Sequence, residues 1–159
     1  MNHELKLNHL SVYLPHQLEM QYIVRDKVQK VGILKNLYFN SCETHPERAS
    51  IDNDDLEHIW MFKPILRPMT DLFEQIEHLG EVIVPADVIG KYFEQYEWSK
   101  SEHLELNILE QSLYDRFIIG DDKQLSPFCP ILVSNILCRL HFDIYGLIPK
   151  GLATIKNIK

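Results

Sequence analysis

The sequence has few cysteines and few glycines, and this scarcity excludes several classes of small protein. Its three cysteines, Cys42, Cys129 and Cys138, are an odd number without compact spacing. Such a set does not make a disulfide framework and favours reduced thiols in a cytoplasm. The six glycines are isolated along the chain, whereas a phosphate-cradling loop needs closely spaced glycines. We therefore expect no nucleotide site of the standard kind.

Long apolar runs and blocks of positive charge are also missing. No segment approaches the ~20 apolar residues of a membrane span, and Glu4 and Lys6 interrupt the apolar N-terminus. We expect neither an export signal nor membrane contact. The 16 basic residues are scattered among 23 acidic ones, which gives a formal charge of −7. Because this surplus repels a phosphate backbone, direct nucleic-acid binding is not expected.

What the sequence does contain is the composition of a packed globule. A chain of 159 residues, of which 45% are hydrophobic, is long enough to bury a core of its own. We predict one globular domain over residues 1–159.

Two-residue periodicity in the first part of the chain predicts strands. Apolar and polar residues alternate over 18–24 and again over 31–39, with the polar turn 25–27 between them, which is typical of a hairpin. The apolar segment 58–62 is a third candidate strand. Residues 40–55 are polar and contain Pro46, so we expect a mobile loop there.

Helical periodicity dominates the second part. Leu72, Phe73, Ile76 and Leu79 predict a helix that begins at Thr70 and ends at Gly80. A short strand over 81–85 and helices over 85–96 and between 99 and 120 follow, and a last helix begins near Pro127 or Pro130 and ends at about His141. Strands early and helices late predict an α+β fold with a small antiparallel sheet of about three to four strands and helices packed on one face.

The segment 62–68, with the sequence FKPILRP, stands where the two patterns meet. Pro64 and Pro68 each move the preceding residue, Lys63 or Arg67, away from helical geometry. We interpret the segment as an extended joint between a strand and a helix. The alternative is that Lys63 or Arg67 contacts an anion.

Three groups of residues have the types needed for metal binding or catalysis, and each has a simpler explanation. Residues 52–55 resemble the start of a calcium loop, but Leu56 occupies a ligand position. Cys42 and His45 would need two more zinc ligands from distant positions. His141 and Asp143 could orient a base, but no nucleophile in a strained elbow accompanies them, so His141 fits better as a charge at a helix end. We predict no metal, no cofactor and no catalytic residue.

Aromatic residues framed by acids form the clearest candidate for a binding face. Tyr92, Phe93, Tyr96 and Trp98 lie among Glu94 and Glu97, an arrangement found at protein-binding surfaces. The alternative is that these rings belong to the core.

Three segments resemble small uncharacterised proteins encoded by phages and prophages of Bacteroidota-type bacteria. They are 5–10 with Tyr13-Leu-Pro15 (LKLNHL and YLP), 62–72 (FKPILRPMTDL) and 141–153 (HFDIYGLIPKGLA). The resemblance implies a small protein made in the cytoplasm of an infected or lysogenic bacterium. It carries no catalytic residue over to this chain.

We therefore expect a non-enzymatic protein of anti-CRISPR or similar anti-defence type. Its surplus of acids would bind a basic host protein, such as a CRISPR-type nuclease, and modulate or inhibit it. The alternative is a small metal-dependent or His/Asp-dependent enzyme or accessory factor, with His45, His58 or His141 meeting carboxylates in the fold. The predicted partner-binding residues are Asp52, Asp54, Asp55, Glu94, Tyr96, Glu97, Trp98, Glu102, Glu105, Asp121 and Asp122.

Overall fold

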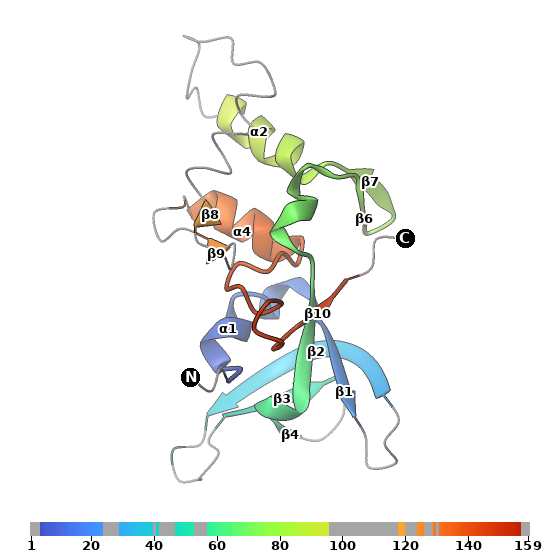
Figure 1. The fold of residues 1–159 in the computed structure, drawn as a ribbon, viewed down its shortest axis with the longest axis vertical. Helices are drawn as coiled ribbons and strands as arrows, with labels where there is room; N and C mark the ends of the chain where they lie inside the picture. The colour runs from blue at the N-terminus through green and yellow to red at the C-terminus, as the bar shows by residue number, and fades with distance from the viewer. Residues whose placement is uncertain are drawn as a thin grey trace. The chain divides into compact units, whose positions relative to one another are not determined.

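The computed structural model describes residues 4–23, 29–39, 41, 47–52, 57–95, 118–119, 124–125, 129 and 131–156; for 92–95, 118–119 and 124–125 it describes the backbone alone. The chain divides into two compact units (Figure 1). Unit 1 is Met1–Leu66 with Leu147–Lys156, and unit 2 is Arg67–Gly146 with Asn157–Lys159. The single domain expected over 1–159 stays a prediction. Within the described ranges, no helix is long and apolar enough to cross a membrane.

Unit 1 is built on a 6-stranded sheet with the order β10-β5-β1-β2-β3-β4. The strands are β1 Glu19–Ile23, β2 Gln29–Phe39, β3 Glu47–Ile51, β4 Glu57–His58, β5 Phe62–Leu66 and β10 Thr154–Ile155. All neighbours are antiparallel except β10 and β5, which are parallel. The α+β class is confirmed, and so is the hairpin of β1 and β2. The expected sheet of three to four antiparallel strands is wrong, because β3 and β10 were not predicted.

Two other expectations for unit 1 need correction. Residues 47–51, assigned to a loop, form β3, since Ala49 and Ile51 alternate with polar residues and are fully buried. Residues 58–62 do not form one strand. They divide into the end of β4, the 3-10 helix η2 (Ile59–Met61) and the start of β5.

One face of the sheet carries the core of unit 1. Met20, Leu34, Ile51 and Leu66 are almost completely buried. The N-terminal segment with the short helices α1 (Leu7–Ser11) and η1 (Leu14–His16) adds two buried side chains, Leu10 of α1 and Tyr13, which precedes η1. The Glu47 carboxylate accepts a hydrogen bond of 3.1 Å from the backbone N–H of Leu7, which fixes the start of α1 to this side of β3.

The centre of the sheet depends on a close approach between β2 and the end of β3. The register shifts between Leu34 and Asn36, and beyond this bulge Asp52 adopts a positive φ of 52°. The Asp52 carboxylate accepts from the N–H of Ile33 at 2.9 Å, and its own N–H donates to the Ile33 carbonyl at 2.8 Å. A Cβ at Gly32 would collide with the Asp52 carboxylate and the Ile51 side chain. Gly32 is therefore required by packing.

We expect Gly32→Ala to destabilise the protein by about 1–3 kcal/mol, the usual range for overpacking, because the methyl group displaces Asp52 or Ile51. Urea denaturation of the variant and the wild type measures the change. Lys30→Ala, at an exposed position of the same strand, is the control and should change the free energy of unfolding by less than about 0.5 kcal/mol. Equal stability of Gly32→Ala and the wild type would contradict the role given to Gly32.

Unit 2 combines short helices with two hairpins. Its elements are the 3-10 helix η3 (Met69–Phe73), β6 (Ile76–His78), β7 (Glu81–Ile83), α2 (Pro85–Gln95), β8 (Ile118–Ile119), β9 (Gln124–Leu125) and α4 (Ile131–Arg139). β6 pairs with β7, and β8 with β9, both antiparallel. The strand predicted at 81–85 is β7, and the helix predicted at 85–96 is α2. The last predicted helix is α4, and of its two proposed starts the one near Pro130 is confirmed. The helix predicted between 99 and 120 lies outside the described residues apart from β8.

The helix predicted from Thr70 to Gly80 is wrong. One 3-10 segment covers 69–73, and the chain then turns into β6. Leu72 and Ile76 are buried, as the predicted apolar face of the helix required, but Leu79 is 89% exposed. The same residues also satisfy a strand pattern, since Ile76 and Ile83 pair across a two-residue turn at Leu79-Gly80. Pairing with β7 therefore outweighs the helical spacing.

Candidate protein-binding surface

The turn of the β6–β7 hairpin carries a large apolar side chain in an unfavourable backbone conformation. Leu79 and Gly80 connect the pair His78 and Glu81 and have φ values of 53° and 82°. Positive φ at both positions is the type I′ pattern, which favours Asn-Gly because a leucine in this region costs roughly 1–2 kcal/mol. The side chain of Leu79 is 89% exposed, so burial does not offset that cost.

Three carboxylates belong to the hairpin or precede it: Glu81 follows the turn, Glu77 lies in β6, and Glu74 comes just before β6. Glu74, Glu77 and Glu81 are exposed, and Val82, paired directly with Glu77, is exposed too. We call this surface the acidic hairpin: Glu74, Glu77, Leu79, Glu81 and Val82. An apolar tip between acidic side chains can contact a partner that carries apolar and cationic groups.

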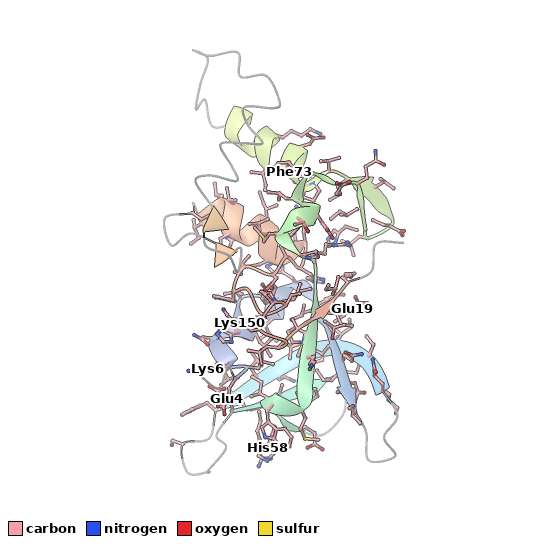
Figure 2. All side chains as sticks on the ribbon, in the orientation of Figure 1. Glu4, Lys6, Glu19, His58, Phe73 and Lys150 are labelled. Carbon is pink, nitrogen blue, oxygen red and sulfur yellow. The ribbon has the colours of Figure 1, made fainter. Side chains whose placement is uncertain are left out.

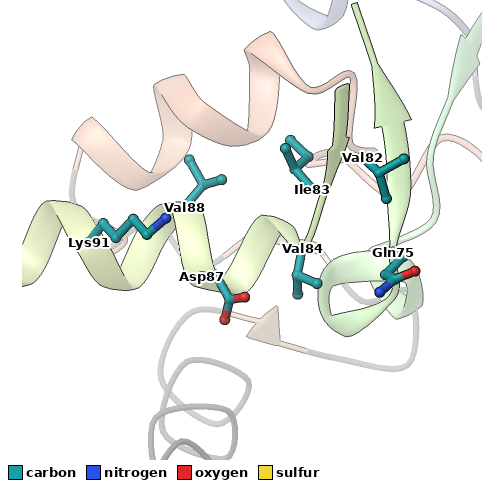
Figure 3. Close-up of a pocket in the computed structure, with 7 residues that line it drawn as sticks. All are labelled: Gln75, Val82, Ile83, Val84, Asp87, Val88 and Lys91. Atoms are coloured by element: carbon teal, nitrogen blue, oxygen red, sulfur yellow. The ribbon is translucent and has the colours of Figure 1, made fainter. Parts of the chain in front are cut away.

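A pocket of about 250 Å³ lies at the base of the acidic hairpin, between the hairpin and α2 (Figure 3). Val82, Val84 and Val88 give it apolar walls, and Asp87 and Lys91 of α2 supply one charge of each sign. The volume is smaller than that of typical drug-sized ligand sites, and it suits a single side chain of a partner. Gln75 and Ile83 complete the lining.

The hairpin is fixed at its base by a buried polar cluster centred on Arg67. The Arg67 guanidinium, on a side chain only 3% exposed, donates to the Glu77 carbonyl at 2.6 Å. The Arg67 N–H donates to the His141 carbonyl at 2.8 Å, and the Asp143 N–H donates to the Arg67 carbonyl at 2.9 Å. The rings of His78 and His141 meet edge to face, with centroids 6.2 Å apart.

Asp71 contributes a carboxyl group to the same region. Burial raises the pKa of Asp71, whereas its hydrogen bond with Thr70 and the positive charge of Arg67 act in the opposite direction. Burial has the larger effect, so the folded state holds an ionised Asp71 at some cost and depends on Arg67 to limit it.

The buried polar cluster around Arg67 stabilises the fold. His141, which follows α4 with a φ of 63°, and Asp143 are both almost fully buried, so a substrate has no access to them. Among the residues that the structure describes, no group of three or more His, Cys, Asp or Glu side chains could hold a metal ion. The interpretation of FKPILRP as an architectural segment fits Arg67, although its first part is strand β5 and η3 takes the place of the expected α-helix.

We expect Arg67→Met to lower the free energy of unfolding by about 3 kcal/mol, because it removes the bond to Glu77 and leaves the buried Asp71 without its nearby cation. The difference from wild type should shrink in acid, since Asp71, whose folded pKa is raised, is then neutral in both proteins. Urea denaturation at neutral and acidic pH tests both statements.

Lys63→Met is the matched control for that measurement. Lys63 belongs to the same segment but is exposed, so its loss should change stability by less than about 0.5 kcal/mol. Equal effects of the two substitutions would contradict the supporting role of Arg67.

Cys129 and Cys138 are free thiols in unit 2. Cys138 lies in α4, and Cys129 comes two residues before that helix. Burial raises the pKa of each from 9.0 to about 11, although hydrogen bonds from Ser134 partly oppose the shift. Two pKa units correspond to roughly 100-fold less thiolate than an ordinary cysteine at neutral pH. These thiols are therefore poor nucleophiles and poor metal ligands in the folded protein.

We expect both thiols to react slowly with iodoacetamide at pH 8 in the native protein and rapidly in urea. A Cys42→Ser background removes the third thiol, and mass spectrometry follows the modification of the other two. The native rate should rise about tenfold per pH unit up to pH 10, because the thiolate fraction rises in that way below the pKa. Native labelling at the rate seen in urea would contradict this expectation.

The predicted partner-binding residues fall mostly outside the described part of the chain. Asp52 is described, and its carboxylate holds the end of β3 against β2. Glu94 lies in α2, where the structure describes its backbone only. The other residues of that set, Asp54, Asp55, Tyr96, Glu97, Trp98, Glu102, Glu105, Asp121 and Asp122, lie outside the described residues. Their role stays a prediction.

Sequence reasoning missed the acidic hairpin because Glu74, Glu77 and Leu79 were assigned to a helix. The signal that could have found it is the Leu-Gly pair between two alternating triplets, Ile76–His78 and Glu81–Ile83.

No protein-family model matches the chain, and neither a curated protein nor a solved structure is significantly similar to it. The residues themselves therefore carry the functional argument.

Proposed function

We propose that this chain is a non-enzymatic interaction protein of phage origin that binds a basic, nucleic-acid-handling host protein and modulates or inhibits it, in the manner of an anti-CRISPR or similar anti-defence protein. The phage origin rests on the resemblance of three segments of the sequence. The basic character of the partner rests on the formal charge of −7. The site of contact rests on the acidic hairpin.

The observation that carries the proposal is the exposure of Leu79 at the tip of that hairpin. An exposed leucine with positive φ lowers the stability of the free protein, so folding alone gives no reason for it. Contact with a partner would bury this side chain, and a central apolar anchor with charged neighbours is a common arrangement of binding hot spots. Glu74, Glu77 and Glu81 would accelerate encounter with a cationic surface and favour it over neutral ones.

The pocket beside the acidic hairpin would be a second point of contact with the partner. A lysine or arginine of the partner could place its aliphatic stem against Val82 and Val88 and its cationic head near Asp87. Lys91, one helical turn after Asp87 in the pocket lining, would disfavour a second cation there. The pocket therefore suits one basic side chain rather than a run of them.

We expect Leu79→Asn to separate binding from stability. Asparagine suits positive φ, so the variant should be as stable as the wild type or more stable by up to about 1 kcal/mol. Loss of the apolar anchor should weaken partner binding about tenfold or more. Immobilised wild type and variant would be incubated with bacterial host lysate at low and high salt, and captured proteins identified by mass spectrometry.

Ile131→Asn is the control for Leu79→Asn, because Ile131 of α4 is also a largely exposed apolar residue of unit 2. The expected result is a basic nucleic-acid-binding protein that the wild type and Ile131→Asn capture at low salt, that Leu79→Asn loses, and whose capture weakens at high salt. Capture of the same protein by all three, or of no basic protein in either salt condition, would refute the proposal.

A further inference from the structure

The pocket between the β6–β7 hairpin and α2 combines one charge of each sign with aliphatic walls (Figure 3). Asp87 and Lys91 are four residues apart in α2, so they lie on the same face of the helix, one turn apart. Val88 of the helix, Ile83 of β7 and Val84, which joins the two elements, are apolar parts of the lining. All lining residues belong to the stretch 75–91, which lies within unit 2.

The opposite face of α2 holds this wall of the pocket in place. Ala86 and Ile89 lie on that face and are only 5% and 1% exposed. The helix also contacts η3, whose Phe73 is labelled in Figure 2. In the first turn, the N–H groups of Asp87 and Val88 donate to the Val84 carbonyl at 3.1 Å and 3.3 Å. The two charged side chains therefore project from a backbone that packing has fixed.

Both charged groups of the pocket are accessible to a ligand. Asp87 and Lys91 are exposed, and within the described ranges neither side chain forms an ion pair or a hydrogen bond. An exposed ion pair at this spacing is weak even where it forms. A ligand that enters between the two groups therefore loses little by keeping them apart.

The charges of the lining discriminate between simple classes of ligand. A cation pairs with Asp87 but leaves Lys91 without a counter-charge, and an anion pairs with Lys91 but is repelled by Asp87. A purely apolar ligand would cover both charged groups and offer neither a hydrogen bond, which costs free energy. A molecule that carries one charge of each sign at one end and an aliphatic group at the other satisfies the whole lining.

We propose that this pocket binds a free aliphatic amino acid as its zwitterion. The α-ammonium group contacts the Asp87 carboxylate, the α-carboxylate contacts the Lys91 ammonium, and a branched side chain such as that of leucine or valine packs on Val84 and Val88. The pocket volume of about 250 Å³ corresponds to roughly eight water molecules at ~30 Å³ each, which is the size of such an amino acid.

This inference goes beyond the proposed function and does not depend on it. Amino-acid binding requires only the purified chain, whereas the proposed function requires a host protein. If both proposals hold, the amino acid and the basic side chain of the partner occupy the pocket in turn, because both contact Asp87. Leu79 does not belong to the pocket lining, so Leu79→Asn should bind the amino acid as the wild type does. The two proposals can therefore fail separately.

Titration of the isotope-labelled protein with L-leucine, followed through the backbone amide signals in NMR spectra, tests the proposal. The signals of residues 83–91 should shift in a saturable way, with half-saturation at about 1 mM, as expected for a ligand of few atoms. Glycine lacks the aliphatic side chain of leucine, isoamylamine lacks its carboxylate, and isocaproate lacks its ammonium group. Each of these three should bind about tenfold more weakly than leucine.

Two substitutions separate the roles of the charges. Asp87→Asn should weaken the binding of leucine and isoamylamine about tenfold and leave that of isocaproate undiminished. Lys91→Gln should weaken leucine and isocaproate in the same measure and leave isoamylamine undiminished. A substitution that acted only through the stability of the fold would weaken all three ligands alike. Urea denaturation verifies that each variant is folded.

Arg139→Gln is the charge control, since it removes an exposed cation of α4 that is not part of the pocket lining, and it should change the affinity for leucine less than about twofold. Absence of a saturable shift of residues 83–91 at about 50 mM leucine refutes the proposal. Equal affinity for leucine and isoamylamine refutes it as well, because the pocket would then be a site for cations. So does an effect of Arg139→Gln equal to that of Lys91→Gln.

Discussion

The structure of unit 2 depends on how Arg67 is held. Its backbone bonds to His141 and Asp143 join the segment after β5 to the segment after α4, positions far apart in the chain. Its guanidinium then reaches the Glu77 carbonyl in β6. A buried guanidinium is stable only where acceptors and countercharge surround it, so the hairpin, Asp71 and the chain after α4 must be in place together. The hydrogen bonds and burial at this base offset the unfavourable backbone conformation at Leu79.

The parts of the fold that followed from the sequence are those with one dominant periodicity. Residues 18–24 and 31–39 alternate with a period of two and form β1 and β2, and the wide apolar stripe after residue 130 forms α4. Residues 70–83 satisfy helix spacing and strand alternation at once. The bond from Arg67 to Glu77 and the pairing with β7 decide between them. The pairing has a weak local signal in the Leu-Gly pair, whereas the bond from Arg67 has none.

The strands that were missed have weak local signals for definable reasons. β3 has the sequence ERASI, in which Ala49 fills a core position that a larger residue would mark more clearly. β10 has two residues, and its place in the sheet depends on Thr154, which donates to Gln21 at 2.7 Å, and on the ion pair of Lys156 with Glu19 at 2.7 Å. Such contacts span most of the chain, so the sequence alone could not predict them.

The candidate sites show why net charge is a limited guide to function. The formal charge of −7 led the sequence analysis to acidic stretches, yet the described acids of unit 1 are largely engaged with its own backbone and with Lys156. What distinguishes a contact surface is an exposed apolar or aromatic side chain held rigidly among charges of one sign, because that side chain gains by being buried. Leu79 meets this description among carboxylates. The pairing of β6 with β7, rather than the composition of the chain, therefore determines where this surface lies.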